Sequence, residues 1–584
     1  MDVPLRAGHT LYLEINKRTR PLLVCFRALP TSIASTLREI AVIMMPITRA
    51  LLLISIILIH GSVFAQAPAK AEAGRPGRPS GGLASLAPEQ SGEVKAVTQA
   101  ILEEIDKRSE LMANIEYLCD MIGPRLTGSP NLTKANHWTR EKFQQYGLSN
   151  AHVEPWTIER AWTRGEAAGR VVVPVEQHIL LESAGWSPST KGPKRGPVLH
   201  LKAQSADELG PYKGNLKGAW VLFSEVSVQP SPKQPAPNMD GEMRRRMRDY
   251  TRMREFRPAL KKFLIEEGAA GVLRDSNKEH GLINMTGASD NFAPAELPEA
   301  FLTTESYGLI WRLLKRGPVE IELDLKNSFS TGEVEVFNTV AELTGAEKSD
   351  EVVIIGGHID SWDLGTGATD NGTGIMAVLE AARALKAVGV KPKRTIRFVL
   401  FSGEEEGLHG SRAYVKAHEK EMPKIAGVLI HDMGTGRVKS IGLQGRYDLR
   451  EVMDRVVEPF KEALNLEELS MRTMMGTDHL SFLPHGVPAF AVVQDIAEYR
   501  KTHHTESDTV DKVYPDEVNQ GAKVLAAWSY NVAMLPEILP RDPKPPQPGM
   551  FDSPEFRQRR DEKNKSEEPK QPDGKPRVAA EAGR

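Results

Sequence analysis

The stretch GGHIDSWDLGTGATDNGTG, residues 356–374, decides how this sequence is expected to fold. It holds one histidine and three aspartates among glycines, and glycine and aspartate by themselves are typical of a surface turn. The stretch follows EVVII, a run typical of a buried strand, and precedes IMAVLEAARALKAVG, which has the pattern of a helix. Carboxylates placed between a buried strand and a helix must be paired, because an unpaired buried charge is costly.

Strand and helix patterns alternate from Glu335 to about Leu539. The predicted strands lie between helical segments and have the sequences EVVIIGGH, TIRFVLFSGEE, IAGVLIHDMG and PAFAVVQD. Such alternation is typical of a mainly parallel sheet with helices on both faces. The predicted fold class is therefore α/β, with a doubly wound, mainly parallel sheet.

The sequence pattern changes between residues 170 and 330, where short predicted strands and turns replace the long predicted helices and strands. GAWVLFSE is typical of a strand, and KKFLIEEGAAGVLRDS of a helix, a tight turn and a strand. We interpret 170–330 as a small inserted domain that divides the main domain into parts at 91–169 and 331–539. Within it, MRRRMRDYTRMREFR is a basic helix whose arginines we expect to be solvated.

The first 90 residues are not expected to belong to the folded domain. Arg49, the apolar run that follows it and Ala65-Gln66-Ala67 form the pattern of a secretory signal peptide, which predicts a periplasmic or extracellular location. We expect Met44 or Met45 to be the true start, residues 1–67 to be removed, and no stable membrane insertion afterwards, since the run is short for a bilayer. Residues 68–90 are predicted to be a flexible leader and 540–584 a disordered tail.

The charge and the cysteine content of the chain exclude some partners and some roles. The chain has 584 residues, 26% of them charged, and a net charge of −2, so a nucleic-acid partner is not expected. Of its two cysteines, Cys25 would leave with the signal peptide. Cys119 would then be the single cysteine, and its apolar surroundings predict a small core residue.

Imidazoles and carboxylates follow every predicted strand of the main domain. They are His358 and Asp360 with Asp370 at the next helix, then Glu404 and Glu405, then His431 and Asp432, and beyond the fourth strand His503 and His504. In open α/β sheets, sites lie beyond the carboxyl ends of the strands. Carboxylates this crowded repel each other unless cations lie among them, and a mixed histidine–carboxylate set suits zinc. His431 and His503 are expected to be structural neighbours of the site.

The stretch at 356–374 together with FSGEEEGLHGS, HDMG and HHTESDT resembles the signature of the co-catalytic di-zinc exopeptidases, peptidase family 28 of the metallopeptidases. CDMIGPRLTGSPN is similar to a segment near the start of that family's catalytic domain, and LKGAWVLF and GAAGVL resemble a protease-associated domain. The resemblance covers about residues 95–540. It implies a zinc-exopeptidase fold with an inserted protease-associated domain, and it suggests a homodimer.

The resemblance also implies a role for each site residue. Asp370 would bridge two Zn²⁺ ions, and Asn371 follows it. The remaining ligands would be His358 and Asp432 on one ion and Glu405 and His504 on the other. Asp360 would hold the His358 ring in its ligating orientation. Glu404 would be the general base, and Glu406 falls at a variable position.

These roles predict an exported peptidase that acts on short peptides or dipeptides through a metal-bridged hydroxide. Two zinc ions lower the pKa of a bridging water to about 7, and Glu404 takes its proton and passes it to the leaving amine. Release of N-terminal residues is the expected direction, with Asp478 in GTDHLSF as a candidate to shape the pocket for the free amino group. Carboxypeptidase action, a glutaminyl cyclase-like acyltransferase and a receptor-like protein without activity are the alternatives.

Overall fold

The computed structural model describes residues 88–226, 255–288, 292–496 and 499–545. The predicted signal peptide and upstream start, most of the leader, most of the basic helix and the tail beyond 545 lie outside these residues. Within the described residues no helix combines the length and the apolar character needed to cross a membrane.

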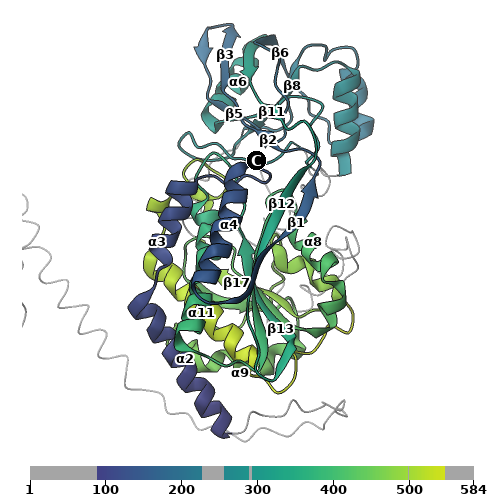
Figure 1. The fold of residues 1–584 in the computed structure, drawn as a ribbon. Helices are drawn as coiled ribbons and strands as arrows, with labels where there is room; N and C mark the ends of the chain where they lie inside the picture. Colours follow the sequence, from purple (N-terminus) through teal and green to yellow (C-terminus); the bar gives the residue numbers. More distant parts are fainter. Residues whose placement is uncertain (1–87, 227–254, 289–291, 497–498, 546–584) are drawn as a thin grey trace, which may run out of the picture. The chain divides into compact units, whose positions relative to one another are not determined.

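One sheet of seven strands organises the main domain (Figure 1). In spatial order its strands are β1 (Ser149–Ile158), β12 (Val334–Leu343), β14 (Arg394–Phe401), β13 (Lys348–His358), β15 (Ile425–Ile430), β17 (Ala489–Gln494) and β16 (Val438–Gly442). The four strands that the sequence predicted correspond to β13, β14, β15 and β17.

The sheet is mixed, which corrects the expectation of a mainly parallel one. β14, β13, β15 and β17 are parallel neighbours at its centre, whereas β1–β12, β12–β14 and β16–β17 pair antiparallel. β1 and β12 run in opposite directions because the chain leaves the sheet along β1 and returns beside it along β12. The fold class remains α/β, and the parallel part is the centre.

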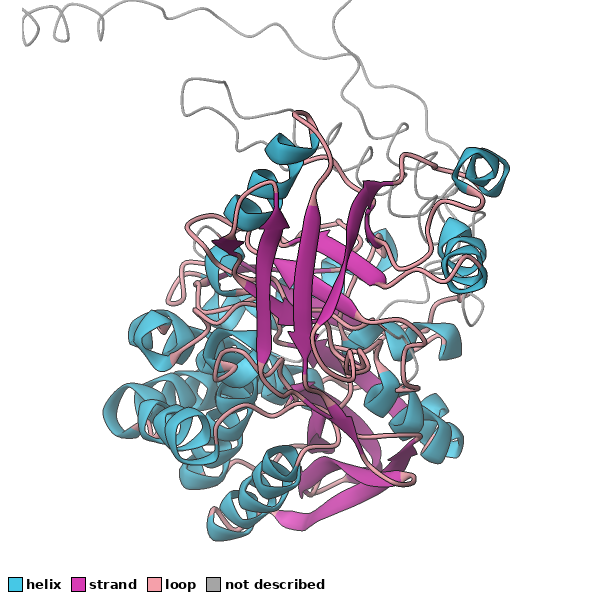
Figure 2. Cartoon of the chain, turned by 90° about the horizontal axis from the view of Figure 1, so that it is seen from above, coloured by secondary structure: helices cyan, strands magenta, loops and turns pink. Residues whose placement is uncertain are grey.

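Helices cover both faces of this sheet, as the doubly wound pattern predicted (Figures 1 and 2). On one face they are α2 (Pro88–Arg108), α3 (Leu111–Glu116), α4 (Pro130–Gln145), α7 (Thr373–Val388), α9 (Arg450–Lys461) and α11 (Pro515–Ala533). On the other face lie α8 (His409–Ala417) and short turns. Side chains of β13 alternate between the two cores, with Val353 and Ile355 in the first and Val352 and Ile354 in the second.

Local signals explain where several of these helices begin and end. α4 starts after Ser129, whose side chain accepts a hydrogen bond from the Leu132 backbone N–H, and Pro130 occupies the first turn. α7 ends at Gly389, which has a φ of 73° that favours glycine. Cys119 is a core residue as predicted, being 1% exposed, and burial raises the pKa of its thiol to about 11.

The segment between β1 and β12 forms a second sheet of eight strands. In spatial order these are β4 (Gln177–His178), β3 (Ala167–Val173), β10 (Glu320–Leu325), β6 (Lys194–His200), β7 (Trp220–Leu222), β8 (Gly271–Asp275), β9 (Glu299–Leu302) and β5 (Leu181–Ser183). α6 (Thr304–Leu314) packs on one face, and a helix at 255–266 packs on the other. The two-stranded ribbon of β2 (Trp162–Thr163) and β11 (Ser328–Phe329) joins the ends of the segment. We call residues 159–333 the insert.

The described part of the chain extends into both predicted flexible segments. α2 begins at Pro88, inside the predicted leader. Arg541, inside the predicted tail, donates hydrogen bonds to the Ile425 and His485 carbonyls, each of 2.9 Å. The start of the tail is therefore bound to the first residue of β15, which the proline-rich composition did not indicate.

Candidate metal centre

The carboxyl ends of the central strands bring the predicted site residues together. β13 ends at His358, which lies opposite Phe401 at the end of β14, and Glu404 and Glu405 follow that strand. Asp432 follows β15, and α10 (Tyr499–Thr502) leads directly into the two histidines of the last motif. Parallel neighbours end at the same edge of a sheet, so residues far apart in sequence meet there.

A first group of ligand atoms forms around His358. Its Nε2 lies 3.1 Å from Asp432 Oδ1 and 3.3 Å from Asp370 Oδ1. All three side chains are at most 7% exposed. The grouping matches one of the two ligand sets that the resemblance implied.

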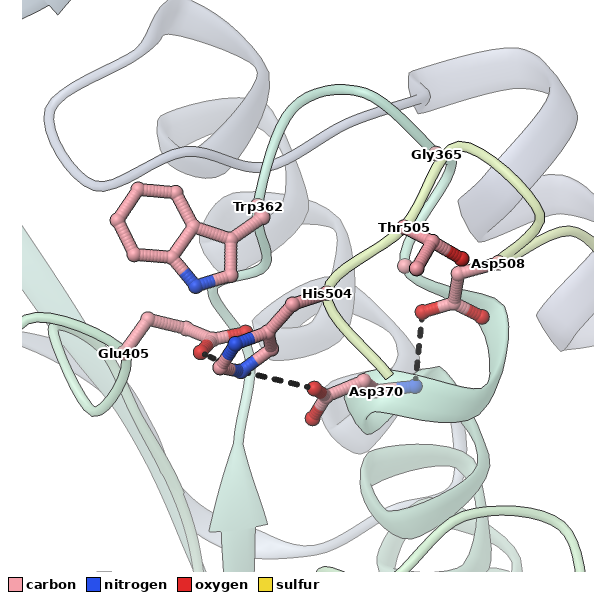
Figure 3. A pocket seen from close by; sticks show the side chains of 8 residues that line it. Trp362, Gly365, Asp370, Glu405, His504, Thr505 and Asp508 are labelled. Carbon is pink, nitrogen blue, oxygen red and sulfur yellow. Dashed lines mark hydrogen bonds and ion pairs between the residues drawn. The ribbon is translucent and has the colours of Figure 1, made fainter. Parts of the chain in front are cut away.

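A second group forms around His504, as Figure 3 shows. Its Nε2 lies 2.9 Å from Glu405 Oε2 and 3.4 Å from Asp370 Oδ2. The neighbouring His503 stacks on the His504 ring, with 3.7 Å between ring centroids, and its Nε2 lies 3.8 Å from Asp370 Oδ2. His503, expected to be only a neighbour, therefore also presents a ligand atom to this group.

Asp370 belongs to both groups. The ligand atoms of His358, Asp370 and Asp432 lie within 4.8 Å of one another, and so do those of Asp370, His503 and His504. Asp370 Oδ2 and Glu405 Oε1 are buried without a hydrogen-bond partner among the described residues. A buried carboxylate oxygen needs a compensating partner, and divalent cations are suitable partners for this donor set. The residues present thus fit a metal centre.

The pKa shifts that the protein's own groups produce also favour a bound cation. Burial raises the pKa of Glu405 well above its ordinary value, and the charge of Asp370 raises it further. Burial alone would lower the pKa of His358, but Asp432, Asp360 and Asp370 raise it well above its ordinary value. These shifts reflect a concentrated negative field, which is what attracts a cation. Burial lowers the pKa of His504 to about 4, which keeps its imidazole neutral and able to ligate.

Asp360 is completely buried and holds the loop after β14. Its Oδ1 accepts the Glu404 backbone N–H at 3.3 Å, and its Oδ2 accepts the Glu405 backbone N–H at 3.2 Å. His358 Nδ1 lies 3.1 Å from the Asp360 carbonyl oxygen and 3.7 Å from the nearer carboxylate oxygen. The nearest partner of His358 Nδ1 is thus the Asp360 main chain, while the Asp360 carboxylate also binds the backbone of the two glutamates.

The Glu404 carboxylate differs from that of Asp360 in its contacts. Among the described residues, no hydrogen bond or ion pair involves its carboxylate. Burial raises its pKa well above the ordinary value, and the charges of Asp432, Asp478 and Glu405 add to the effect. A carboxylate that is free of partners and has a raised pKa suits proton transfer.

Two residues that the sequence placed beside the site support its backbone. Asn371 Nδ2 donates to the His431 carbonyl at 2.8 Å, and its Oδ1 accepts the Gly374 N–H at 3.0 Å. The His431 ring faces away from the two metal-ligand groups, toward α11, where a Cβ on Gly521 would lie 2.7 Å from its Nε2. His431 is therefore a neighbour, as expected.

The sequence alone did not indicate a role for several site residues, because the groups they contact are distant in the chain. Asp508 accepts the Thr369 N–H at 2.6 Å and the Asp370 N–H at 3.1 Å, and so orients the shared carboxylate (Figure 3). Burial raises the pKa of Asp508 to about 7. Glu406, set aside as variable, is buried and accepts the Thr127 hydroxyl at 2.8 Å.

The loop from Ile359 to Gly367 closes over the centre. Arg125, which is fully buried, donates to the carbonyls of Ile359 at 2.7 Å, Thr366 at 2.8 Å and Gly367 at 2.8 Å. The Trp362 ring stands edge-on to His504 with 6.1 Å between centroids, and its buried indole N–H has no partner among the described residues. Together with Asp370, Glu405 and His504 it lines a cavity of about 170 Å³.

Known proteins resemble the chain over this same region. Residues 338–529 match the model of peptidase family M28. Carboxypeptidase Q of Pongo abelii is 31% identical over 431 residues, which cover 73% of this chain and 86% of that protein. This chain belongs to peptidase family M28. It is a metallopeptidase, and the family that the motifs indicated is confirmed.

Solved M28 structures share the fold. The M28 peptidase precursor of Shewanella amazonensis is 27% identical, with a TM-score of 0.67 over 78% of this chain and all of that one. The zinc aminopeptidase of Bacillus subtilis, at 22% identity, has a TM-score of 0.53 over 72% of this chain and 93% of that one, and supports the fold alone.

Proposed function

We propose that this M28 peptidase is a zinc-dependent exopeptidase that releases N-terminal residues from short peptides or dipeptides. The observation that carries the proposal is that Asp370 belongs to both groups of ligand atoms. In this proposal two Zn²⁺ ions share Asp370. One is completed by His358 and Asp432, and the other by Glu405 and His504.

The chemistry of the donors supports zinc. Imidazole and carboxylate ligands suit Zn²⁺, and neutral imidazole is the form that binds. The His358 and His504 rings both direct Nε2 at Asp370, one at each of its two oxygens, as a bridging carboxylate requires. A relative of the same fold is named a zinc aminopeptidase.

Bound metal ions supply Lewis acidity, which acidifies the attacking water and polarises the scissile carbonyl. The residues of the chain then position and move protons. Glu404, without a partner of its own, accepts the proton of the attacking water and returns it to the leaving amine. Asp360 holds Glu404 in place through its backbone N–H, and Asp508 holds Asp370 in the same way.

The direction of cleavage rests on Asp478. This aspartate is fully buried, no ion pair among the described residues balances its charge, and it lies within electrostatic reach of His358 and Asp432. Burial raises its pKa to about 7, although the Ser411 side chain lowers it in part. A buried carboxylate without a balancing charge suits the α-ammonium of a substrate, because the bound charge would compensate for its burial.

The proposal is tested with one short peptide in free, N-acetylated and C-amidated forms. The purified protein is loaded with zinc, and products are identified by mass spectrometry with and without chelator. We expect chelator-sensitive loss of residues from the N-terminus, blocked by acetylation and unaffected by amidation. Asp478→Asn should raise KM for the free peptide at least tenfold.

Other outcomes separate the alternatives. Trimming from the C-terminus, blocked by amidation, would make the protein a carboxypeptidase, in line with the name of its carboxypeptidase Q relatives. Cyclisation of an N-terminal glutamine without hydrolysis would make it an acyltransferase. Cleavage that chelator leaves unchanged would refute the metal-dependent proposal altogether.

We further propose that the protein is exported. The support is the pattern of a basic residue, a short apolar run and Ala65-Gln66-Ala67 in the first residues. N-terminal sequencing of the protein secreted by its host should find a chain that starts just after Ala67. A protein that keeps its first residues and stays in the cytoplasm would overturn this part.

A further inference from the structure

A segment of the insert reaches the turn that carries His503 and His504. It lies between β8 and β9, at residues 277–285. Lys278 Nζ donates to the Arg500 carbonyl at 2.9 Å and to the His503 carbonyl at 2.8 Å. The Met285 backbone N–H donates to the His504 carbonyl at 2.8 Å. We call residues 277–285 the clasp.

The carbonyls that the clasp binds are those that the histidine turn does not bind itself. Within the turn, the His503 N–H donates to the Tyr499 carbonyl at 2.8 Å, and the Thr505 N–H donates to the Thr502 carbonyl at 2.9 Å. The carbonyls of residues 500, 503 and 504 receive their hydrogen bonds from the clasp. Backbone carbonyls are strong acceptors, and the clasp supplies these three with donors that the turn itself does not provide.

The backbone of His504 needs an external support. Its φ is 59°, in the left-handed region that side chains other than glycine rarely adopt. In this conformation the ring directs Nε2 at Glu405 and Asp370. Met285 binds the carbonyl of this residue, and Lys278 binds the preceding one. The main-chain conformation that aims the ligand is thus fixed by two contacts from the insert.

The clasp is itself attached to the other side of the centre. Arg164 of the insert donates to both carboxylate oxygens of Asp363 at 2.8 Å each, and its Nη2 lies 3.0 Å from Met285 Sδ. Asp363 belongs to the loop between His358 and Asp370. On the histidine turn, Glu506 accepts the Ile283 backbone N–H with both oxygens, at 2.9 and 3.1 Å. The insert therefore contacts two of the segments that supply proposed metal ligands, the loop before Asp370 and the histidine turn.

We infer that the clasp is a positioning element for the metal centre, and that Lys278 sets the affinity of the metal held by His504. The inference rests on the proposed metal site and extends it. Lys278 touches neither substrate nor metal and acts through the main chain of the turn. The insert thereby has a role in catalysis beyond that of a separate binding domain.

The test compares Lys278→Met with Lys262→Met, an exposed lysine of the insert that pairs only with Glu266 in its own helix among the described residues. Zinc affinity is measured in the full chain by competition with a chromophoric chelator, with metal content checked by mass spectrometry. We expect Lys278→Met to weaken one zinc at least tenfold and leave the other within twofold. Lys262→Met should match the unmodified protein, and Lys278→Arg, which keeps donors, should recover most of the affinity.

Two further measurements keep the outcome clear. Glu506→Ala removes a surface contact of the clasp, should fold, and should weaken the same zinc about threefold. Thermal unfolding of the zinc-free proteins separates positioning from general stability, since a purely structural lysine would lower the melting temperature and leave zinc affinity unchanged. That result, or equal affinity in Lys278→Met and Lys262→Met, would overturn the inference while leaving the proposed function standing. Failure of the unmodified chain to bind zinc would instead refute the proposed function.

Discussion

Three carboxylates of the metal centre have different surroundings, and this assigns them different tasks. Asp360 accepts two backbone N–H groups and the Thr127 hydroxyl. Glu405 contacts His504 and directs a second, unpartnered oxygen into the centre. Glu404 makes no such contact among the described residues and is free to exchange a proton. These different surroundings support the proposed roles of the three acids, with Asp360 as support, Glu405 as metal ligand and Glu404 as base.

The assignment of Glu404 predicts the behaviour of Glu404→Gln. The amide keeps the size of the side chain but cannot accept the proton of the attacking water, so kcat should fall by about 10²–10⁴-fold. Zinc content should remain that of the unmodified protein, because Glu404 is not among the proposed ligands. Turnover is measured on a short free peptide and metal content by mass spectrometry. A fully metal-loaded variant with unchanged kcat would contradict the assignment.

Among the elements, the loop from Ile359 to Gly367 depends on one buried arginine. Its carbonyls face Arg125, and Gly367 has no room for a side chain, since a Cβ there would lie 2.5 Å from Ser361 Oγ and 2.8 Å from Arg125 Nη2. The loop links His358 to Asp370, so the guanidinium holds the spacing between two ligands of the first group.

Arg125→Lys tests this support while keeping the charge. A single ammonium cannot reach three carbonyls in the geometry of a guanidinium, and each hydrogen bond from a charged group contributes about 1.5–3 kcal/mol. We expect the free energy of unfolding to fall by about 2–4 kcal/mol in urea and kcat/KM to fall at least tenfold. Arg455→Lys, on the exposed face of α9, is the matched control and should change neither. A stable, active Arg125→Lys variant would remove the arginine from this role.

His418 joins two elements on the edge of the main sheet. It follows α8, its Nε2 lies 3.0 Å from Glu154 Oε1 of β1, and its Nδ1 lies 3.0 Å from Glu421 Oε1. Burial alone would lower its pKa, but hydrogen bonds to Glu154 and Glu421 raise it above the ordinary value. The charged ring therefore stabilises the folded state, chiefly by fastening β1.

The raised pKa of His418 predicts that the free energy of unfolding depends on pH. Because the pKa of His418 is raised on folding, its contribution is complete below the ordinary pKa of about 6.5 and is lost as pH rises through the folded value. The difference in unfolding free energy between the unmodified protein and His418→Gln should be about 1 kcal/mol at pH 6 and should shrink by pH 9. Chemical denaturation at both pH values measures it. A gap that stays constant or grows with pH would contradict the prediction.

For the whole molecule, metal binding and folding should be linked. Carboxylates of both ligand groups lie buried without enough protein partners, so we expect the folded state to bind the cation and the unfolded chain not to bind it. At a free zinc concentration of 100 Kd, one such site stabilises the fold by about 2.7 kcal/mol. We expect chelator to lower the melting temperature by a few degrees and added zinc to restore it. Identical melting with and without zinc would mean that the metal does not bind the folded centre.

Much of the fold was predictable because strand and helix patterns depend on neighbouring residues. β13, β14, β15 and β17 follow their predicted sequences, and so does α7. The antiparallel edges were not predicted, since the partnership of β1 with β12 joins residues on either side of the long insert. The helical start at Pro88 and the bound Arg541 were missed for a similar reason, because composition indicates flexibility but does not show what a segment packs against.

The sequence by itself determined the strand–helix units and the kinds of side chain at the strand ends, since each depends on residues a few positions away. Only the tertiary structure decided how those side chains are supported. Arg125 binds a carbonyl 242 positions along the chain, and Lys278 binds one 225 positions along. It also showed that His503 faces Asp370 and that the Asp360 carboxylate accepts the backbone N–H groups of both glutamates. Such contacts depend on how distant segments meet when the sheets form, and no local pattern encodes them.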